Sequence, residues 1–409
     1  MNYNLKEKLK NLTILVYYLN RIFLLYRIYK CNNDRFCGEE SVAEKSYKYR
    51  IYPNKKQREL IQKTFGCARF VYNYYLNKKK ELYENNKKQI SLGECRKDLT
   101  ALKQELSWLK EPDKCALQNS LIDLDFGFKM FINKNNGYPK FKSKKNNYKS
   151  YRTNYTYNNI RFENNHIRLP KIGLVKIKEK RIVSGRILNA TISQDPNGYY
   201  YCSVCCTDIN YEQHSKTGYN VGVDLGIIDF AILSDGIKVD NPHFYERSEI
   251  KISKLQRELS RKTIGSNRQK KARVKLAKAY KKVTNQRIDF LQKLSTTIVN
   301  NYDIVCIEDL DVQKMKETHV TLRNKRVGDV SWSMFRQMLT YKCHWHEKKL
   351  VVIDRYYPSS QICHCCGHND GKKSENVRAW ICPKCHSELD RDVNAAINIL
   401  GEGLKQLNV

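Results

Sequence analysis

The stretch Asn220-Val-Gly-Val-Asp-Leu-Gly226 has the pattern of a short buried β-strand that ends in a turn. Two later segments, Asp303-Ile-Val-Cys-Ile-Glu-Asp309 and Leu350-Val-Val-Ile-Asp354, are likewise short and apolar and end on carboxylates. Helical patterns accompany these strands, as a basic stretch over residues 249–301 and an amphipathic one over residues 332–347. Strands that alternate with helices predict an α/β sheet in the C-terminal half of the chain.

The N-terminal half has the pattern of a second, mainly β unit. Residues 47–52 alternate like a strand and are followed by Pro53, and short strand-like segments return over residues 150–208. Apolar stripes at helical spacing fill the interval, over residues 56–83, 99–109 and 115–131. A sheet that begins at residue 47 and resumes near residue 150 implies that helices are inserted into a β domain.

The chain carries a large excess of positive charge. Its 409 residues include 75 lysines and arginines against 42 acidic residues, a formal net charge of +33. An anionic partner relieves the self-repulsion of such a chain. Because 28 tyrosines are interleaved with the basic residues, we expect nucleic acid rather than a membrane surface: aromatic rings stack on bases while basic side chains follow phosphates.

Cysteine usage and the N-terminal segment bear on location. Fifteen cysteines in a large, lysine-rich chain indicate a reducing cytosol rather than a disulfide scaffold. Residues 12–29 are apolar and aromatic, but Asn20, Arg21 and Arg27 interrupt them, and no signal-peptide cleavage site follows. Residues 1–44 are therefore interpreted as an accessory extension, with a membrane anchor as the less favoured alternative.

Three acidic residues stand out by their positions. Asp224 interrupts an apolar strand, Glu308 ends another, and Asp392 opens a helical run. An acid among buried residues is costly unless it is paired, hydrogen-bonded or bound to a cation, and carboxylates gathered at strand ends suit a hard cation. Two Mg²⁺ or Mn²⁺ ions about 4 Å apart can promote hydrolysis of a phosphodiester.

Each of these acids also has an ordinary interpretation. Asp224 could form a turn, Glu308 could pair with a surface lysine, and Asp392 could be a favoured acid at a helix N-terminus. In a chain of this charge the three together favour a nuclease.

Two cysteine pairs have the spacing of a metal site. Cys363-His-Cys-Cys366 and Cys382-Pro-Lys-Cys385 are separated by fifteen residues, which is typical of a zinc ribbon with one tetrahedral Zn²⁺. Cys363, Cys366, Cys382 and Cys385 are the expected ligands, and Cys365 is interpreted as a bystander. Less favoured substitutes are His364, His368 and His386. We expect a structural zinc with no catalytic role.

Taken together, the motifs of this chain resemble the TnpB (also called OrfB) family of bacterial insertion sequences and, more distantly, the compact type V CRISPR effectors. The likeness extends from about Lys45 to Leu400. It rests on Tyr-Arg-Ile-Tyr-Pro-Asn (49–54), Phe-Gly-Cys-Ala-Arg-Phe-Val-Tyr-Asn (65–73), Ala-Leu-Gln-Asn-Ser-Leu (116–121), Gly-Tyr-Pro-Lys-Phe-Lys-Ser-Lys (137–144), Val-Asp-Leu-Gly-Ile (223–227), Ile-Glu-Asp-Leu (307–310), Pro-Ser-Ser-Gln-Ile-Cys (358–363) and Leu-Asp-Arg-Asp-Val-Asn-Ala-Ala-Ile-Asn-Ile (389–399).

The resemblance implies an α/β plus β architecture. A wedge β-barrel carries an inserted helical recognition domain, and a RuvC nuclease domain of RNase H-like fold carries the zinc ribbon. The implied boundaries are 45–54 and 138–210 for the wedge, 55–137 for the recognition domain, 218–356 and 388–409 for the nuclease domain, and 357–387 for the ribbon.

The resemblance also implies an activity, RNA-guided cleavage of DNA. A guide RNA from the transposon end would direct a monomer to double-stranded target DNA beside a short transposon-associated motif, where both strands are cut. The three metal-binding carboxylates of the family fall on Asp224, Glu308 and the second aspartate of Asp390-Arg-Asp392. A bacterial cytoplasmic, nucleoid-associated location is expected. Two alternatives stay open, a nuclease-independent RNA-guided repressor and a transposase acting directly on transposon ends. A zinc-ribbon transcription factor is weaker because it leaves the carboxylates unexplained.

Residues that read the DNA motif in the family lie on the recognition helices and adjoining wedge strands. Lys114, Gln118 and Thr156 match that pattern, although an ordinary polar helix face is an equal explanation for the first two. This chain departs from the pattern at Leu92, Arg96, Cys115 and Tyr157, so it is expected to read a different motif.

Overall fold

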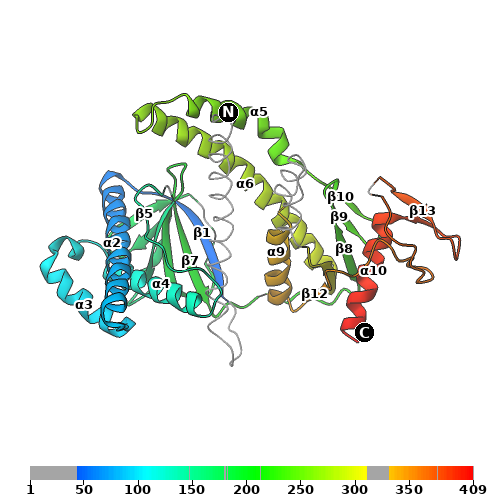
Figure 1. Ribbon diagram of the computed structural model, residues 1–409, viewed down its shortest axis with the longest axis horizontal. Coiled ribbons are helices and arrows are strands. Elements are labelled where there is room, and N and C mark those ends of the chain that lie inside the picture. Colours follow the sequence, from blue (N-terminus) through cyan, green and yellow to red (C-terminus); the bar gives the residue numbers. More distant parts are fainter. Residues whose placement is uncertain are drawn as a thin grey trace.

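Two large β-sheets, a small two-stranded ribbon and the helices around them make up the described part of the chain (Figure 1). The computed structural model describes residues 44–408, except residues 147, 179–180, 182, 212, 311–330 and 375. Apart from Glu44, the expected accessory extension lies outside the described residues. Among the helices that are described, each is too short or too polar to cross a lipid bilayer.

The first sheet has seven strands in the order β2-β6-β7-β1-β5-β4-β3. Its members are β1 (Lys45–Tyr52), β2 (Lys149–Asn154), β3 (Arg161–Glu163), β4 (His166–Leu169), β5 (Gly173–Ile177), β6 (Arg186–Gln194) and β7 (Tyr200–Thr207). β1 pairs antiparallel with β5 on one side and β7 on the other. The helices that follow β1 in the chain are therefore inserted into a single sheet. This is the arrangement predicted from a strand at residue 47 and further strands after residue 150.

The inserted helices pack on one another and on this sheet. They are α2 (Lys55–Asn86), α3 (Leu92–Glu105), a 3₁₀ turn η1 (Ser107–Lys110) and α4 (Lys114–Ile132). α3 begins seven residues before the expected start at residue 99, because Ser91 and Glu94 form a reciprocal capping box that satisfies the first free amides. Val71, Tyr75, Leu99 and Leu121 share one buried cluster.

The second sheet has five strands in the order β10-β9-β8-β11-β12. Its members are β8 (Asn220–Leu225), β9 (Asp229–Leu233), β10 (Lys238–Asp240), β11 (Ile304–Glu308) and β12 (Lys349–Ile353). β11 lies between β8 and β12 and runs parallel to both, whereas β9 returns antiparallel to β8. The predicted α/β sheet is therefore confirmed, in a mixed form.

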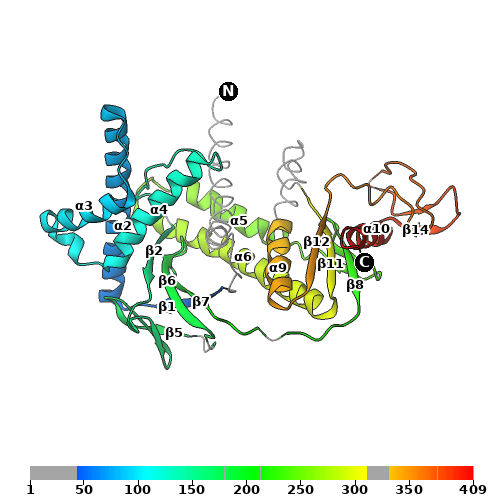
Figure 2. The ribbon, with the colours of Figure 1, turned by 90° about the horizontal axis from the view of Figure 1, so that it is seen from below.

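Helices cover both faces of the second sheet (Figure 2). They are α6 (Asn267–Asn301), α9 (Trp332–Trp345) and α10 (Arg391–Gln406), whereas α5 (Phe244–Ser260) packs on α6. On one face Leu291 of α6 and Phe335 of α9 bury Val223 and Ile307 of the sheet. On the other face Ile399 of α10 joins a smaller core with the strands. Coverage on both faces explains why these strands are continuously apolar in sequence.

The approach of α10 to β8 is close enough to require glycine at the contact. A Cβ atom on Gly222 would lie 2.0 Å from the carbonyl oxygen of Ala396 and 2.7 Å from the amide nitrogen of Leu400. Both neighbours are backbone atoms of the helix and cannot rotate away. The glycine of the Val-Gly-Val-Asp segment therefore determines how deeply α10 sits on the sheet.

The two sheets are joined through the long helix α6, which runs from beside the first sheet to the core of the second (Figure 1). At the β6–β7 turn, Lys281 of α6 lies 3.2 Å from the carboxylate of Asp195, whose side chain is 1% exposed. Farther along the junction, Trp345 of α9 stacks on Tyr211 with ring centroids 4.9 Å apart. A buried ion pair and an aromatic stack thus connect the two units.

The contact at Gly222 predicts a stability difference between two glycine variants. Gly222→Ala should lower the free energy of unfolding by on the order of 3 kcal/mol, because the added methyl meets backbone on α10. Gly401→Ala, on α10 itself with nothing within 4 Å of its Cβ position, should raise it by about 0.5–1 kcal/mol. Denaturant unfolding followed by circular dichroism measures both, and equal stabilities would contradict the packing described.

Candidate active site and metal centre

The three sequence-predicted acids come together at one edge of the second sheet. Asp224 is the penultimate residue of β8, and Glu308 is the last residue of β11, the adjacent parallel strand. Because Val223 is opposite Ile307 in the register, the next position of each strand is an acid. Asp392 lies in the first turn of α10, which starts at this edge. Three segments distant in sequence thus supply one carboxylate each.

The charges of these acids act on one another. Burial raises the pKa of Asp224 well above its ordinary value, and the negative charges of Glu308 and Asp392 raise it further. Burial also raises the pKa of Glu308, although a hydrogen bond from Ser359 opposes this effect. Like charges held together in a partly buried site disfavour ionisation unless a cation is present. Carboxylate oxygens are the ligands that hard divalent cations prefer.

Asp392 and its near neighbour Asp390 have different surroundings. Asp390 caps α10, accepting hydrogen bonds from the amides of Asp392 and Val393 at 3.0 Å each, and its carboxylate pairs with Lys238 at 2.6 Å. The side chain of Asp392 is only 9% exposed, and its carboxylate lies 2.7 Å from the guanidinium of Arg378. Asp390 therefore serves the helix terminus, while Asp392 belongs to the acidic cluster.

Asp309, which directly follows Glu308, is directed away from the cluster. Burial by itself would raise the pKa of Asp309, but hydrogen bonds from Arg355 and Arg336 hold it below its ordinary value. The guanidinium of Arg355 lies 2.6 Å from its carboxylate. Asp309, the first residue after β11, thus has a different environment from Glu308.

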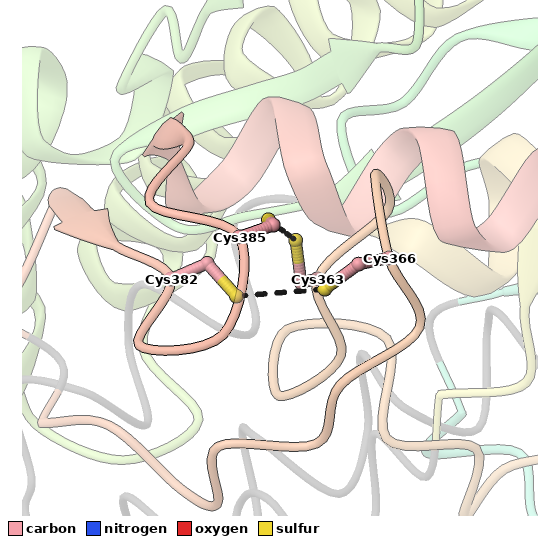
Figure 3. Close-up of side chains that lie close together, drawn as sticks. All are labelled: Cys363, Cys366, Cys382 and Cys385. Atoms are coloured by element: carbon pink, nitrogen blue, oxygen red, sulfur yellow. Dashed lines mark hydrogen bonds between the residues drawn. The ribbon is translucent and has the colours of Figure 1, made fainter.

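The four cysteines of the two CxxC pairs converge beyond the end of β12 (Figure 3). Their sulfur atoms all lie within 4.8 Å of one another, and two of the separations, Cys363–Cys385 and Cys366–Cys382, are 3.6 Å. A tetrahedral zinc ion with Zn–S distances of about 2.3 Å needs sulfur atoms about 3.8 Å apart. The four side chains therefore fit a closed zinc site.

The two cysteine turns have similar backbone hydrogen bonds and similar φ angles. The amide of Gly367 donates to the carbonyl of Cys363 at 2.8 Å, and the amide of His386 donates to that of Cys382 at 2.9 Å. Both donors have positive φ angles, 73° and 60°. Cys365 is exposed and lies 3.4 Å from its neighbour His364, outside the sulfur cluster. The strand β13 (Ala379–Ile381), just before the second cysteine pair, pairs antiparallel with β14 (Glu388–Asp390), which leads into α10.

The candidate motif-reading residues lie on an exposed surface of the first unit. Lys114 and Gln118 are one turn apart on α4, and Thr156 follows β2 in an exposed loop. Asn119 joins these elements, because its amide donates to Asn154 at 3.1 Å. Cys115, by contrast, is buried and contributes nothing to this surface.

Sequence reasoning missed two contacts to the acidic cluster, those of Ser359 and Arg378. The hydroxyl of Ser359 donates to Glu308 at 2.6 Å across 51 residues, and Arg378 reaches Asp392 from the zinc ribbon. Ser359 lies within a motif already noted, Pro358-Ser-Ser-Gln-Ile-Cys363, but nothing in the motif's spacing indicates which acid it touches. A serine and an arginine are too common on protein surfaces to be singled out by type.

Family models match most of the described chain. Residues 43–88 match the helix-turn-helix domain of the OrfB/IS605 group, and residues 202–319 match its "Probable transposase" model. Residues 332–399, which include the four cysteines and Asp392, match the "Cas12f1-like, TNB domain".

Similar proteins cover nearly the whole chain. A Streptomyces pristinaespiralis protein named "Putative RNA-guided DNA endonuclease" is 37% identical over 367 residues, 88% of this chain and 90% of that protein. InsQ of Escherichia coli, with the same description, is 29% identical over 373 residues, 88% of this chain and 92% of InsQ. Among solved structures, the Cas12f1–sgRNA–target DNA complex has a TM-score of 0.58 at 10% identity, covering 88% and 99% of the two chains, which indicates a shared fold.

The sulfur geometry predicts one zinc ion per chain. Cys366→Ser should lower the bound zinc well below one equivalent because it removes one of four thiolates, whereas Cys365→Ser should retain a full equivalent. Elemental analysis of purified protein, combined with native mass spectrometry, measures both. Equal loss from the two variants would show that the ligand set is different from the one described.

Proposed function

This chain belongs to the TnpB (OrfB) family of insertion-sequence proteins, and we propose that it is an RNA-guided DNA endonuclease with Asp224, Glu308 and Asp392 at its active site. The observation that carries the proposal is the meeting of these three acids at one sheet edge, where burial and mutual repulsion raise the pKa of Asp224. Such an arrangement is unfavourable unless ion pairs, hydrogen bonds or bound cations compensate it, and the pKa of Asp224 stays raised despite the contacts that Ser359 and Arg378 make to the other two acids. A protein that only bound DNA would gain nothing from it.

The domain assignment forms part of the same proposal. We assign the seven-stranded sheet to a wedge domain, the inserted helices to a recognition domain, and the five-stranded sheet with α10 to a RuvC nuclease domain. The boundaries are 45–54 and 138–210, 55–137, and 218–356 with 388–409, and the ribbon occupies 357–387. The strand orders and the fold shared with the Cas12f1 complex support this division.

Catalysis in this proposal depends on where the side chains hold charge. Two divalent cations, most simply Mg²⁺, would polarise the attacking water and stabilise the leaving oxygen of the phosphodiester. Asp224 and Glu308 would hold them from the ends of parallel strands, and Asp392 would do so from the helix above. Ser359 donates a hydrogen bond to Glu308, and Arg378 pairs with Asp392 from the ribbon. Zinc would serve the ribbon alone, because four cysteines close its coordination.

Guide RNA and target DNA are the proposed partners. The net charge of +33 supports an anionic partner, and the relatives described above carry the name of RNA-guided enzymes. The junction of the two sheets adds a local observation. Between the β6–β7 turn and α6 lies a pocket of about 260 Å³ lined by Tyr199, Lys278, Lys281 and Lys282. Basic side chains beside a tyrosine ring suit a nucleic-acid backbone and its bases.

Cleavage should depend on each of the three acids while target binding does not. Asp224→Ala, Glu308→Gln and Asp392→Ala should each lower the cleavage rate by roughly 10²- to 10³-fold, as expected when a group needed for charge stabilisation in the transition state is lost. Asp390→Asn, which keeps the helix cap, should retain most of the rate. The assay uses the purified complex with its copurifying RNA, which is sequenced first, Mg²⁺, and DNA matching the guide.

Three results of this assay would count against the proposal. Uncut matching DNA with the unaltered complex would remove the endonuclease and favour an RNA-guided repressor. Cleavage that survives RNase treatment would favour a transposase acting directly on DNA ends. Full activity of all three acid variants would mean that the site lies elsewhere.

The exposed surface of α4 generates a separate prediction about DNA-motif recognition. Gln118→Ala should change the preferred flanking sequence, because an amide side chain can read a base edge, at a cost of about 1–3 kcal/mol for the preferred base. Lys114→Ala should weaken binding to all flanks alike, because lysine supplies a phosphate contact. A cleavage assay on a randomised flank measures both effects. An unchanged flank preference in Gln118→Ala and Thr156→Ala would assign these residues to an ordinary polar surface.

A further inference from the structure

We infer that Ser359 is a positioning residue for Glu308, and that Asn398 and Asn394 of α10 hold Ser359 in place. The inference rests on the proposed function, because it concerns how one of the proposed metal-holding acids is oriented. It gives a role to two motifs that are otherwise unexplained, Pro358-Ser-Ser-Gln-Ile-Cys363 and the asparagines that follow Asp392.

The contact between Ser359 and Glu308 is short and partly buried. The hydroxyl of Ser359 donates to Oε1 of Glu308 at 2.6 Å, and Ser359 is 6% exposed. A hydroxyl bonded to an ionised carboxylate makes one of the stronger hydrogen bonds in proteins. With Oε1 engaged in this way, Oε2 keeps both of its lone pairs for a cation. The serine thereby restricts the rotamer of Glu308 and favours Oε2 as the atom that it presents.

Ser359 is fixed in turn by the side chain of Asn398. The amide nitrogen of Asn398 donates to the carbonyl of Ser359 at 2.8 Å and to that of Ile362 at 2.7 Å. One turn earlier on the helix, Asn394 donates to the same Ile362 carbonyl at 2.7 Å and accepts from the amide of His364 at 2.9 Å. Both asparagines are buried. Segment 359–364 is therefore bound along α10 through its backbone.

The helix that carries Asp392 thus also carries the support for Glu308. Asn398 lies six residues after Asp392, about 9 Å along a rigid helix. The distance between Asp392 and the serine that orients Glu308 is set by that helix. Because β11 ends at Glu308 and offers no further strand pairing beyond it, the serine supplies an orientation that the sheet alone does not. Outer contacts of this kind change metal affinity or activity by roughly 10- to 100-fold when removed.

The first test removes the hydroxyl and then restores it. Ser359→Ala should weaken Mn²⁺ binding roughly 10- to 100-fold, as measured by electron paramagnetic resonance on the RNA-free protein. It should also raise the Mg²⁺ concentration that gives half-maximal cleavage by roughly 10- to 100-fold. Ser359→Thr, which keeps a hydroxyl, should recover most of both. The dissociation constant for target DNA in EDTA and the zinc content should stay unchanged. Ser360→Ala, which removes the adjacent hydroxyl, is the matched control.

The second test asks whether Asn398 acts through Ser359. Asn398→Asp replaces a donor with a carboxylate facing two carbonyl oxygens, and it should show the same metal signature as Ser359→Ala. The double variant should bind Mn²⁺ no more weakly than the more impaired of the two single variants, because both changes remove the same support of Glu308. Additive losses would overturn this part. Zinc content and the thermal midpoint identify a variant that fails to fold, and loss of zinc in Ser359→Ala would overturn positioning in favour of a purely structural role.

The outcomes separate this inference from the proposed function. If Glu308→Gln abolishes cleavage and Mn²⁺ binding while Ser359→Ala matches the unaltered protein, only the positioning role is overturned. If Glu308→Gln cleaves and binds Mn²⁺ normally, the active-site assignment and the positioning role are both overturned.

Discussion

The packing of α10 on β8 at Gly222 is the contact on which the rest of the second sheet depends. Only a residue without a side chain admits the helix backbone so close to the strand. That proximity brings the first turn of α10 to the edge where the parallel strands β8 and β11 end. Asp392 then meets Asp224 and Glu308, although it lies 84 positions after the nearer of them in the sequence, with the four-cysteine segment in between. The position of Asp392 beside the other two acids thus depends on the backbone packing of α10 on β8.

The four-cysteine segment and the acidic cluster are connected by hydrogen bonds and an ion pair. The segment that leaves β12 for the ribbon passes Glu308 at Ser359 and then follows α10, which leads back to Asp392. Arg378, within the ribbon, contacts Asp392 from the other side. The four-cysteine segment is therefore not an independent unit, because the chain that folds around the sulfur atoms also contacts two of the three acids.

Much of this arrangement could be predicted from sequence, and the reason is local. Asp224, Glu308 and the CxxC pairs stand out because an acid in an apolar strand and paired cysteines are unusual within a few residues. The α/β sheet followed from the same short segments. By contrast, the Ser359–Glu308 hydrogen bond and the Lys281–Asp195 ion pair join residues far apart in the chain. Such contacts depend on tertiary packing, which no local pattern of serine, lysine or aspartate encodes. Even the early start of α3 depended on a side-chain pair, Ser91 and Glu94, that apolar spacing overlooks.

The central place of β1 in the first sheet has a consequence for biosynthesis. β1 is the first described strand to leave the ribosome, yet its neighbours β5 and β7 are made only after all of the inserted helices. At about 5–20 residues per second, roughly 8 to 30 s pass between β1 and β7. During that interval the helices can pack locally, while an alternating strand with both edges unpaired stays open to wrong partners. Early docking of β1 on α2, through Ile51 and Phe65 of their shared core, offers the nascent strand a native contact before its sheet exists.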